Sequence, residues 1–190
     1  MSTLDQPLSE NKSLSPWPFA LRYGLIIGLI GIVLGLILYL MMGTGGDFPD
    51  NAWIYFSLIG LLSFVIGIVG LVLSAKAYRK ALGGFISFNK AFQAAFFTGL
   101  VVIGVSLVWQ IFNETVLVPD MEAYSEQMAR MFMEPFGMPP EQIDEALDAQ
   151  RPMYKGLGRS MLNTVFGGGI FYTIVALIVG ATVKKTQPDV

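Results

Sequence analysis

The chain has 190 residues, of which 54% are hydrophobic and 14% are charged, with a formal net charge of -2 and neither histidine nor cysteine. This composition is too apolar for an ordinary soluble domain, and the length suits one helical membrane bundle. The missing residue types exclude disulfides, thiolate and imidazole catalysis, haem ligation by His or Cys, and the usual zinc and iron–sulfur sites, and no segment has the charge of a nucleic-acid-binding arm.

Residues 1–18 are rich in Ser and Pro, mix charges and lack apolar periodicity, so they predict a flexible cytoplasmic tail. They are followed by an apolar stretch of about 20 residues, longer than the 7 to 15 of a secretory signal peptide. The first apolar stretch is therefore expected to remain in the membrane as an anchor.

Four stretches of 20 to 24 residues contain no Asp, Glu, Lys or Arg: Tyr23–Met42, Ala52–Ala75, Ala91–Asn113 and Ser160–Val183. A helix that rises about 1.5 Å per residue crosses a hydrocarbon core of roughly 30 Å with such a length. The sequence predicts an all-α, four-transmembrane-helix bundle with spans at about 20–42, 52–75, 91–113 and 160–183. The membrane domain then covers 19–185, and 186–190 form a second cytoplasmic tail.

Small residues recur within three of the spans at the spacing that lets membrane helices approach closely. The candidate packing positions are Gly24, Gly28, Gly31, Gly35, Gly60, Gly67 and Gly180. We favour packing within one chain over homodimerisation through the first span, because such motifs are common in membrane helices.

Basic residues predict the orientation. They occur as Lys12 and Arg22 at the first span, as Lys76, Arg79, Lys80 and Lys90 in the second loop, and as Lys184 and Lys185 after the last span. The first loop has none, and the long third loop combines Arg130, Arg151, Lys155 and Arg159 with nine acidic residues. The positive-inside rule then places both termini and the second loop in the cytoplasm of an inner (plasma) membrane protein. Lys76, Arg79, Lys80 and Lys90 are also candidate contacts for anionic lipid, although a loop that only sets the topology is the simpler interpretation.

The second loop should continue as helix to about Ala81 and break at Gly83 and Gly84, where the backbone needs freedom in φ. Ser87 is a plausible N-cap for the third span. The loop is therefore expected to be a short, defined turn.

Residues 114–159 form the sizeable extracytoplasmic insertion. Apolar residues recur at helical spacing up to a break at Pro135 and Gly137, and a second short helix should start at Pro139 or Pro140 and stop near Pro152. This pattern predicts an amphipathic helical hairpin whose apolar faces must be covered. The candidate partner contacts are Met121, Tyr124, Met128, Met131, Phe132, Ile143 and Leu147.

The spans carry no ionisable residue at mid-membrane depth, where a proton relay or transport site would normally have one. Gln110, Asn113, Glu114 and Asn163 could gather at the outer mouth, and structural hydrogen bonds are favoured there over a ligand site. The acidic residues of the insertion lack calcium-loop spacing, and no nucleotide-binding or hydrolase motif occurs. No metal, cofactor or catalytic residue is expected.

The segment Lys76–Phe92, KAYRKALGGFISFNKAF, resembles the signature of a bacterial membrane-protein family known as domain of unknown function 4199. The family's typical elements occur in this sequence as the basic–aromatic run Lys76–Lys80, the Gly83–Gly84 pair, the Ile86–Phe88 element before an Ala/Phe-rich span, and, after that span, Pro119 with Asp120. The similarity extends over about Arg22 to Lys185. It implies a four-span protein, found chiefly in the Bacteroidota, and implies no activity or cofactor.

These observations favour the interpretation that the chain is a non-enzymatic inner-membrane protein. It would act as an accessory or interaction module through its outer hairpin. Its expected partners are the lipid bilayer and another membrane or periplasmic protein, or a second copy of itself. The alternative is a small oligomeric transporter or channel lined by neutral polar residues. A lipid-modifying enzyme that uses Glu114 with Gln110 and Asn163 ranks third.

Overall fold

The computed structural model describes residues 14–42, 51–118, 121–154 and 156–185. The helices are α1 (Trp17–Met42), α2 (Ala52–Ala81), α3 (Phe88–Phe112), α4 (Met121–Met133), α5 (Pro140–Tyr154) and α6 (Leu157–Val183), with a π-helix η1 (Asn113–Leu117) after α3 and a 3₁₀ turn η2 (Glu134–Phe136) after α4. The predicted all-α class is confirmed. Over the described ranges, the one β-type pairing is an isolated bridge between Ile86 and Lys185.

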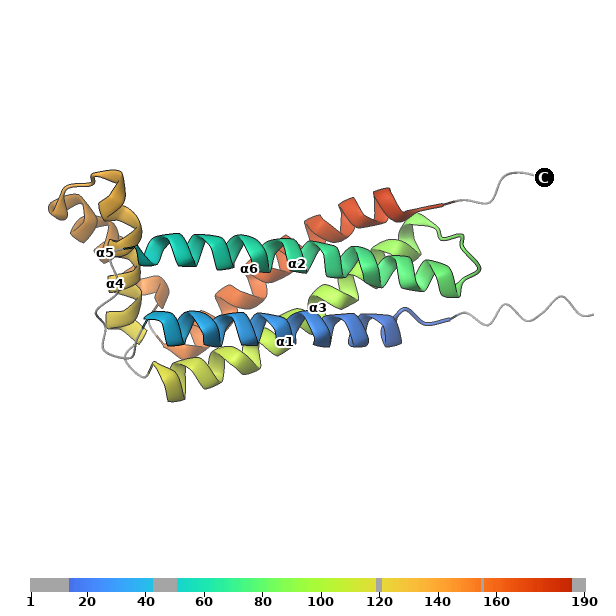
Figure 1. The fold of residues 1–190 in the computed structure, drawn as a ribbon, viewed down its shortest axis with the longest axis horizontal. Helices are drawn as coiled ribbons and strands as arrows, with labels where there is room; N and C mark the ends of the chain where they lie inside the picture. The colour runs from blue at the N-terminus through green and yellow to red at the C-terminus, as the bar shows by residue number, and fades with distance from the viewer. Residues whose placement is uncertain (1–13, 43–50, 119–120, 155, 186–190) are drawn as a thin grey trace, which may run out of the picture.

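Helices α1, α2, α3 and α6 run up and down along the long axis of the molecule (Figure 1). The start of α1, the α2–α3 turn and the end of α6 lie together at one end, which we call the terminal end. Helices α4 and α5 lie at the opposite end, the hairpin end, where α4 runs across the axis of the bundle. Helix α3 packs against α1, α2 and α6 and is the central helix of the bundle.

All four long helices are long and apolar enough to cross a membrane, with a mean hydropathy between 1.9 and 2.7 over an 18-residue stretch of each. Their outward side chains are apolar too: Leu29 of α1, Leu61 of α2 and Phe166 of α6 are each more than half exposed. A bundle with such an exterior requires lipid as its solvent, because water would face large contiguous apolar patches. The chain is an integral membrane protein.

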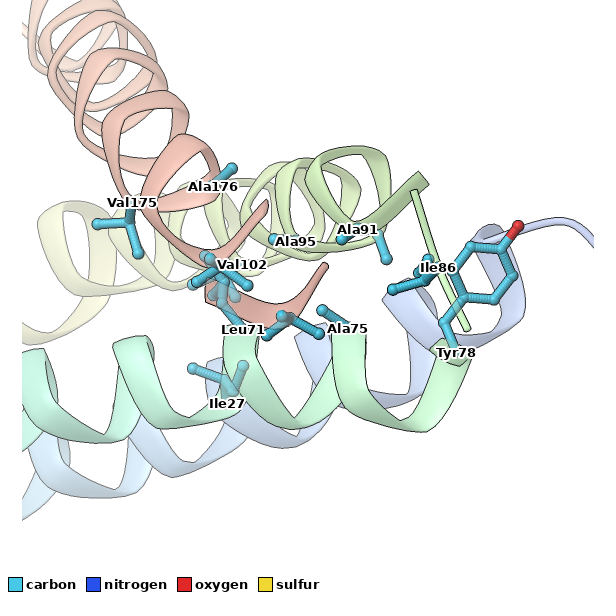
Figure 2. Packing of buried hydrophobic residues seen from close by; sticks show 13 residues of the cluster. Ile27, Leu71, Ala75, Tyr78, Ile86, Ala91, Ala95, Val102, Val175 and Ala176 are labelled. Carbon is cyan, nitrogen blue, oxygen red and sulfur yellow. The ribbon is translucent and has the colours of Figure 1, made fainter. Parts of the chain in front are cut away.

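Buried apolar side chains gather in the half of the bundle near the terminal end. Figure 2 shows Leu71 and Ala75 of α2 beside Ala95 and Val102 of α3. The hydroxyls of Ser74 and Thr98 form a hydrogen bond of 2.7 Å within this cluster, so both buried polar groups are satisfied. Alanine and serine at these positions allow α2 and α3 to approach closely.

Glycines of α1 face α3. A Cβ atom placed on Gly24 would lie 2.6 Å from Val101, one on Gly28 would lie 2.6 Å from Val105, and one on Gly35 would lie 3.3 Å from the indole of Trp109. Gly180 of α6 packs against Phe88 and Phe92 in the same way. Gly31, Gly60 and Gly67 have no atom within 4 Å of such a Cβ.

The α2–α3 turn has the predicted local structure. Helix α2 ends at Ala81, Gly83 and Gly84 have φ of 84° and 93°, and the Ser87 side chain accepts a hydrogen bond from the Lys90 backbone N–H. Positive φ is the conformation in which glycine avoids the Cβ clash of other residues. Glycine therefore permits the chain to reverse within a few residues here.

Three segments distant in sequence are tied together at the terminal end. Ile86 and Lys185 exchange two backbone hydrogen bonds of 2.9 Å, and Arg79 Nη1 donates to the Val183 carbonyl at 3.1 Å. The Tyr78 hydroxyl donates to the Leu14 carbonyl at 2.5 Å. We call this set the terminal clasp; it joins the α2–α3 turn to the end of α6 and to the residues before α1.

Some predicted boundaries differ from the structure. Helix α5 runs two residues past Pro152, to Tyr154, whereas a stop near the proline was expected. Helix α1 begins at Trp17, inside the stretch 1–18 that was predicted as a tail. The π-helix after Phe112 was not predicted. Tails 1–13 and 186–190, together with Pro119 and Asp120, lie outside the described residues.

Candidate functional site

The hairpin formed by α4 and α5 is held by apolar contact and by charge. Ile143 of α5 is 1% exposed, and the Phe132 ring lies 6.0 Å from the Phe56 ring of α2 between centroids. Arg130 pairs with Glu126 on its own helix at 3.2 Å and with Asp144 of α5. These hydrogen bonds and charges raise the pKa of Arg130, so it is a permanent cation that links the two helices.

Tyr124 of α4 is half-buried near the hairpin end of α1. Burial raises the pKa of its phenol, and the nearby Tyr39 raises it further. The Tyr39 hydroxyl in turn donates to the Leu117 carbonyl at 3.3 Å. The first turns of α4 are thus placed against the end of the bundle.

The predicted partner contacts mostly lie on the inner side of the hairpin. Tyr124, Met128, Met131, Phe132 and Leu147 are half-buried, and Ile143 is buried, while the side chain of Met121 is outside what the structure describes. Among the described side chains of the hairpin, the large apolar ones that are exposed are Phe136, 81% exposed, and Met138, 45% exposed, both in the α4–α5 turn. Helical periodicity could not find them, because they flank Gly137 where the period is interrupted; two bulky apolar residues beside a turn glycine are the signal that was available.

A polar network joins α3, η1 and α6 near the hairpin end. Glu114 Oε1 accepts from Gln110 Nε2 at 2.8 Å and from the Ser160 hydroxyl at 2.7 Å, and the Thr164 hydroxyl donates to Gln110 Oε1 at 2.8 Å. Gln110 Nε2 also contacts Ser160 Oγ. Of the residues that the sequence grouped here, Gln110 and Glu114 are in the network, whereas Asn113 is half-buried beside it and Asn163 is exposed.

The π-helix contributes to this network. Val118 N–H bonds to the Asn113 carbonyl, and the wide turn over Asn113–Leu117 begins next to Glu114. Single π turns are frequent at functional sites. The Glu114 carboxylate in this turn accepts hydrogen bonds from Gln110 of α3 and from Ser160 of α6.

The basic residues of the α2–α3 turn fall into two groups. Arg79 is half-buried and bonded to the end of α6, so it is a structural member of the terminal clasp. Lys76, Lys80 and Lys90 are exposed at the terminal end. Among the described residues, no group of three carboxylates lies close enough together to hold a metal ion.

A cavity of about 260 Å³ lies between the four long helices, between the buried core and the hairpin end. Residues of α1, α2, α3 and α6 line it, including Gly31, Gly67 and Trp109. No charged side chain is among its lining residues.

The profile of the family described as "Protein of unknown function (DUF4199)" matches residues 22–185. The chain belongs to this family. No curated protein and no solved structure gives a significant match.

The part of the chain that matches the DUF4199 family includes most of the terminal clasp. The matched range ends at Lys185, whose backbone pairs with Ile86 of the α2–α3 turn. The segment that carried the sequence resemblance therefore has a structural explanation: its Arg79, its glycines and its Ile86 close the terminal end of the bundle.

Proposed function

We propose that this DUF4199 protein is a non-enzymatic accessory protein of the bacterial inner membrane, and that its α4–α5 hairpin docks another membrane or periplasmic protein. In this proposal both termini are cytoplasmic and the hairpin is extracytoplasmic. The bundle supplies the anchor and sets the position of the hairpin.

The observation that carries the proposal is the exposed apolar tip of the hairpin. Phe136 and Met138 project from a turn whose flanking helices are fixed by the Arg130–Asp144 pair and by buried Ile143. Large apolar side chains exposed outside the membrane spans often mark a contact site, and aromatic residues carry much of the energy of such contacts. Methionine also adapts its shape to a partner surface.

Charge supports the orientation. Lys76, Lys80 and Lys90 are exposed at the terminal end, together with Lys184 and Lys185. The described hairpin instead carries exposed carboxylates, at Glu134, Glu141, Asp144, Glu145 and Asp148. Since short basic loops are retained in the cytoplasm, this distribution favours a cytoplasmic terminal end.

Site-specific photocrosslinking in native membranes tests the docking role. A photoreactive amino acid in place of Phe136 should give a discrete protein adduct that mass spectrometry identifies, whereas the same substitution at Gln142, an exposed polar position on α5, should give much less. A discrete protein adduct from the Phe136 position, with little or none from Gln142, would support the proposal. Adducts with lipid alone would contradict it and would indicate that the tip enters the membrane interface.

A further inference from the structure

The cavity between the long helices exists because glycine replaces larger residues on two of its walls. Gly31 of α1 and Gly67 of α2 both line it, and neither has an atom within 4 Å of the place where a Cβ would be. This contrasts with Gly24, where Val101 of α3 fills the place of a side chain, and with Gly28, which also lines the cavity but packs against Val105 of α3. Membrane helices associate by van der Waals packing, so an unfilled volume of this size loses stabilising contacts unless something occupies it.

The lining contains polar groups that make no hydrogen bond in the protein. The hydroxyls of Ser63 and Ser106 have no partner within the described chain, although Ser57, Thr98 and Thr173 each donate to the carbonyl four residues earlier. The Trp109 indole N–H and the Tyr172 hydroxyl, which also belong to lining residues, are likewise without a partner there. No fully buried side-chain N or O atom is left unpaired in the described part of the chain, so these groups retain some accessible surface.

Their depth makes this arrangement costly. Ser63 and Ser106 lie well inside spans α2 and α3, where little water is present to satisfy a free donor. A polar group without a partner in an apolar medium is destabilising, so a ligand with acceptor oxygens at this point would recover free energy that apolar chains could not.

The chemistry of the wall narrows the ligand class. Trp109 is a donor only, the serine and tyrosine hydroxyls can donate, and no lining side chain is charged, so a neutral molecule with acceptor oxygens fits and an ionic headgroup does not. Trp109 and Tyr172 also contribute aromatic surface to the lining. Ile30 is 37% exposed and Gly31 is exposed, so the cavity meets the lipid-facing surface along α1, from which a membrane-dissolved molecule could enter.

We propose that this cavity is a binding site for a lipid-soluble quinone, with the carbonyl oxygens accepting hydrogen bonds from Ser63, Ser106, Trp109 or Tyr172 and the isoprenoid chain leaving toward the bilayer. This inference concerns the membrane half of the molecule and does not depend on the hairpin's docking role. It assigns binding and no redox step.

Tryptophan fluorescence of the full-length protein in lipid nanodiscs tests the site, because quinones quench a nearby indole. Replacing Trp17 and Trp53 by Phe leaves Trp109 as the single tryptophan of a chain that has three. Titration with a short-chain ubiquinone should quench Trp109 fluorescence saturably. Gly67→Leu, which places a side chain in the cavity, should weaken the apparent affinity by at least about tenfold, whereas Gly60→Leu, on the same helix at an exposed glycine outside the cavity, should leave it unchanged.

A second pair of variants covers the case in which Gly67→Leu disturbs folding. Ser63→Ala with Ser106→Ala removes two donors with little change in volume and should also weaken quenching, while the protein elutes as the parent does on size exclusion. Quenching that rises linearly and equally in all variants would overturn the proposal, since it reports quinone dissolved in lipid. Saturable quenching by lipids with brominated acyl chains, with none by the quinone, would also overturn it and assign the cavity to an acyl chain.

Discussion

At the residue scale, glycine has two opposite roles in this bundle. Gly24 and Gly28 remove side chains so that valines of α3 can contact the α1 backbone, whereas Gly31 and Gly67 remove side chains and leave space. The sequence could predict that small residues matter for packing, because their spacing is visible. It could not assign the role of each one, since that depends on what the facing helix places opposite.

The contact glycines give a stability prediction. Gly24→Ala places a Cβ 2.6 Å from Val101 Cβ, so α1 and α3 must separate, which should destabilise the protein by about 1 to 3 kcal/mol. Thermal unfolding in detergent, followed by the loss of the monodisperse peak, measures the effect. Gly60→Ala is the matched control and should be neutral or slightly stabilising, because its Cβ meets open space and alanine is the better helix former. Equal losses in the two variants would show that the α1–α3 contact is not as described.

Tyr124 gives a prediction of pH dependence. Its raised phenol pKa means that the neutral form is favoured where α4 rests against the bundle, so the stabilisation is present below the ordinary value of 10.0 and is lost as pH rises through the raised pKa. Ultraviolet difference titration of the parent should therefore contain a late-ionising phenol that Tyr124→Phe lacks, and proteolysis of the parent's hairpin should accelerate over the same pH range. In Tyr124→Phe the late phenol should disappear, and hairpin proteolysis should no longer accelerate over that pH range. If the substitution instead removed a phenol that ionises near the ordinary value of 10.0, burial of Tyr124 would be excluded.

At the element scale, structural features that depend on a few adjacent residues were predicted well. Features that depend on contacts between distant segments were not predicted. Ser87 as N-cap and the Gly83–Gly84 reversal follow from local backbone chemistry, and both were predicted. Glu114 of the π-helix Asn113–Leu117 accepts a hydrogen bond from Ser160 of α6. No pattern of neighbouring residues predicts this contact between distant segments. The terminal clasp was not predicted for the same reason. In the sequence Arg79 is one of several basic residues in a loop that sets the topology, and only the structure shows its hydrogen bond to the end of α6.

The terminal clasp predicts that two neighbouring basic residues differ in importance. Arg79→Gln removes a charged donor from the Val183 carbonyl at the end of α6, a loss of about 1.5 to 3 kcal/mol for a hydrogen bond to a charged group. Lys80→Gln removes the same formal charge from an exposed side chain and should have a much smaller effect. Hydrogen exchange at the end of α6 measures the difference, and comparable protection in both variants would argue against the clasp.

At the scale of the whole molecule, the two halves of the bundle are built differently. Alanine, serine and glycine bring α2, α3 and α6 together near the terminal end, and the terminal clasp closes that end. In the other half a cavity remains between the helices, a polar network replaces apolar packing between α3 and α6, and α4 and α5 lie beyond it. Composition and span lengths sufficed to predict the four-helix bundle; this division could not be read from them, because all four spans are similarly apolar along their length.

The docking proposal depends on the orientation of the bundle in the membrane, and this orientation can be measured directly. Since the chain has no cysteine, single-cysteine variants need no background substitutions. Gln127→Cys, at an exposed position of α4, should react with a membrane-impermeant maleimide on intact cells whose outer membrane has been made permeable. Ala81→Cys, exposed at the end of α2, should react only after the inner membrane is opened. Reaction of Ala81→Cys alone in intact cells would invert the bundle and place the hairpin in the cytoplasm, where a periplasmic partner could not reach Phe136. Reaction of both would mean that the apolar helices do not separate the two ends, contrary to a bundle whose exterior is fitted to lipid.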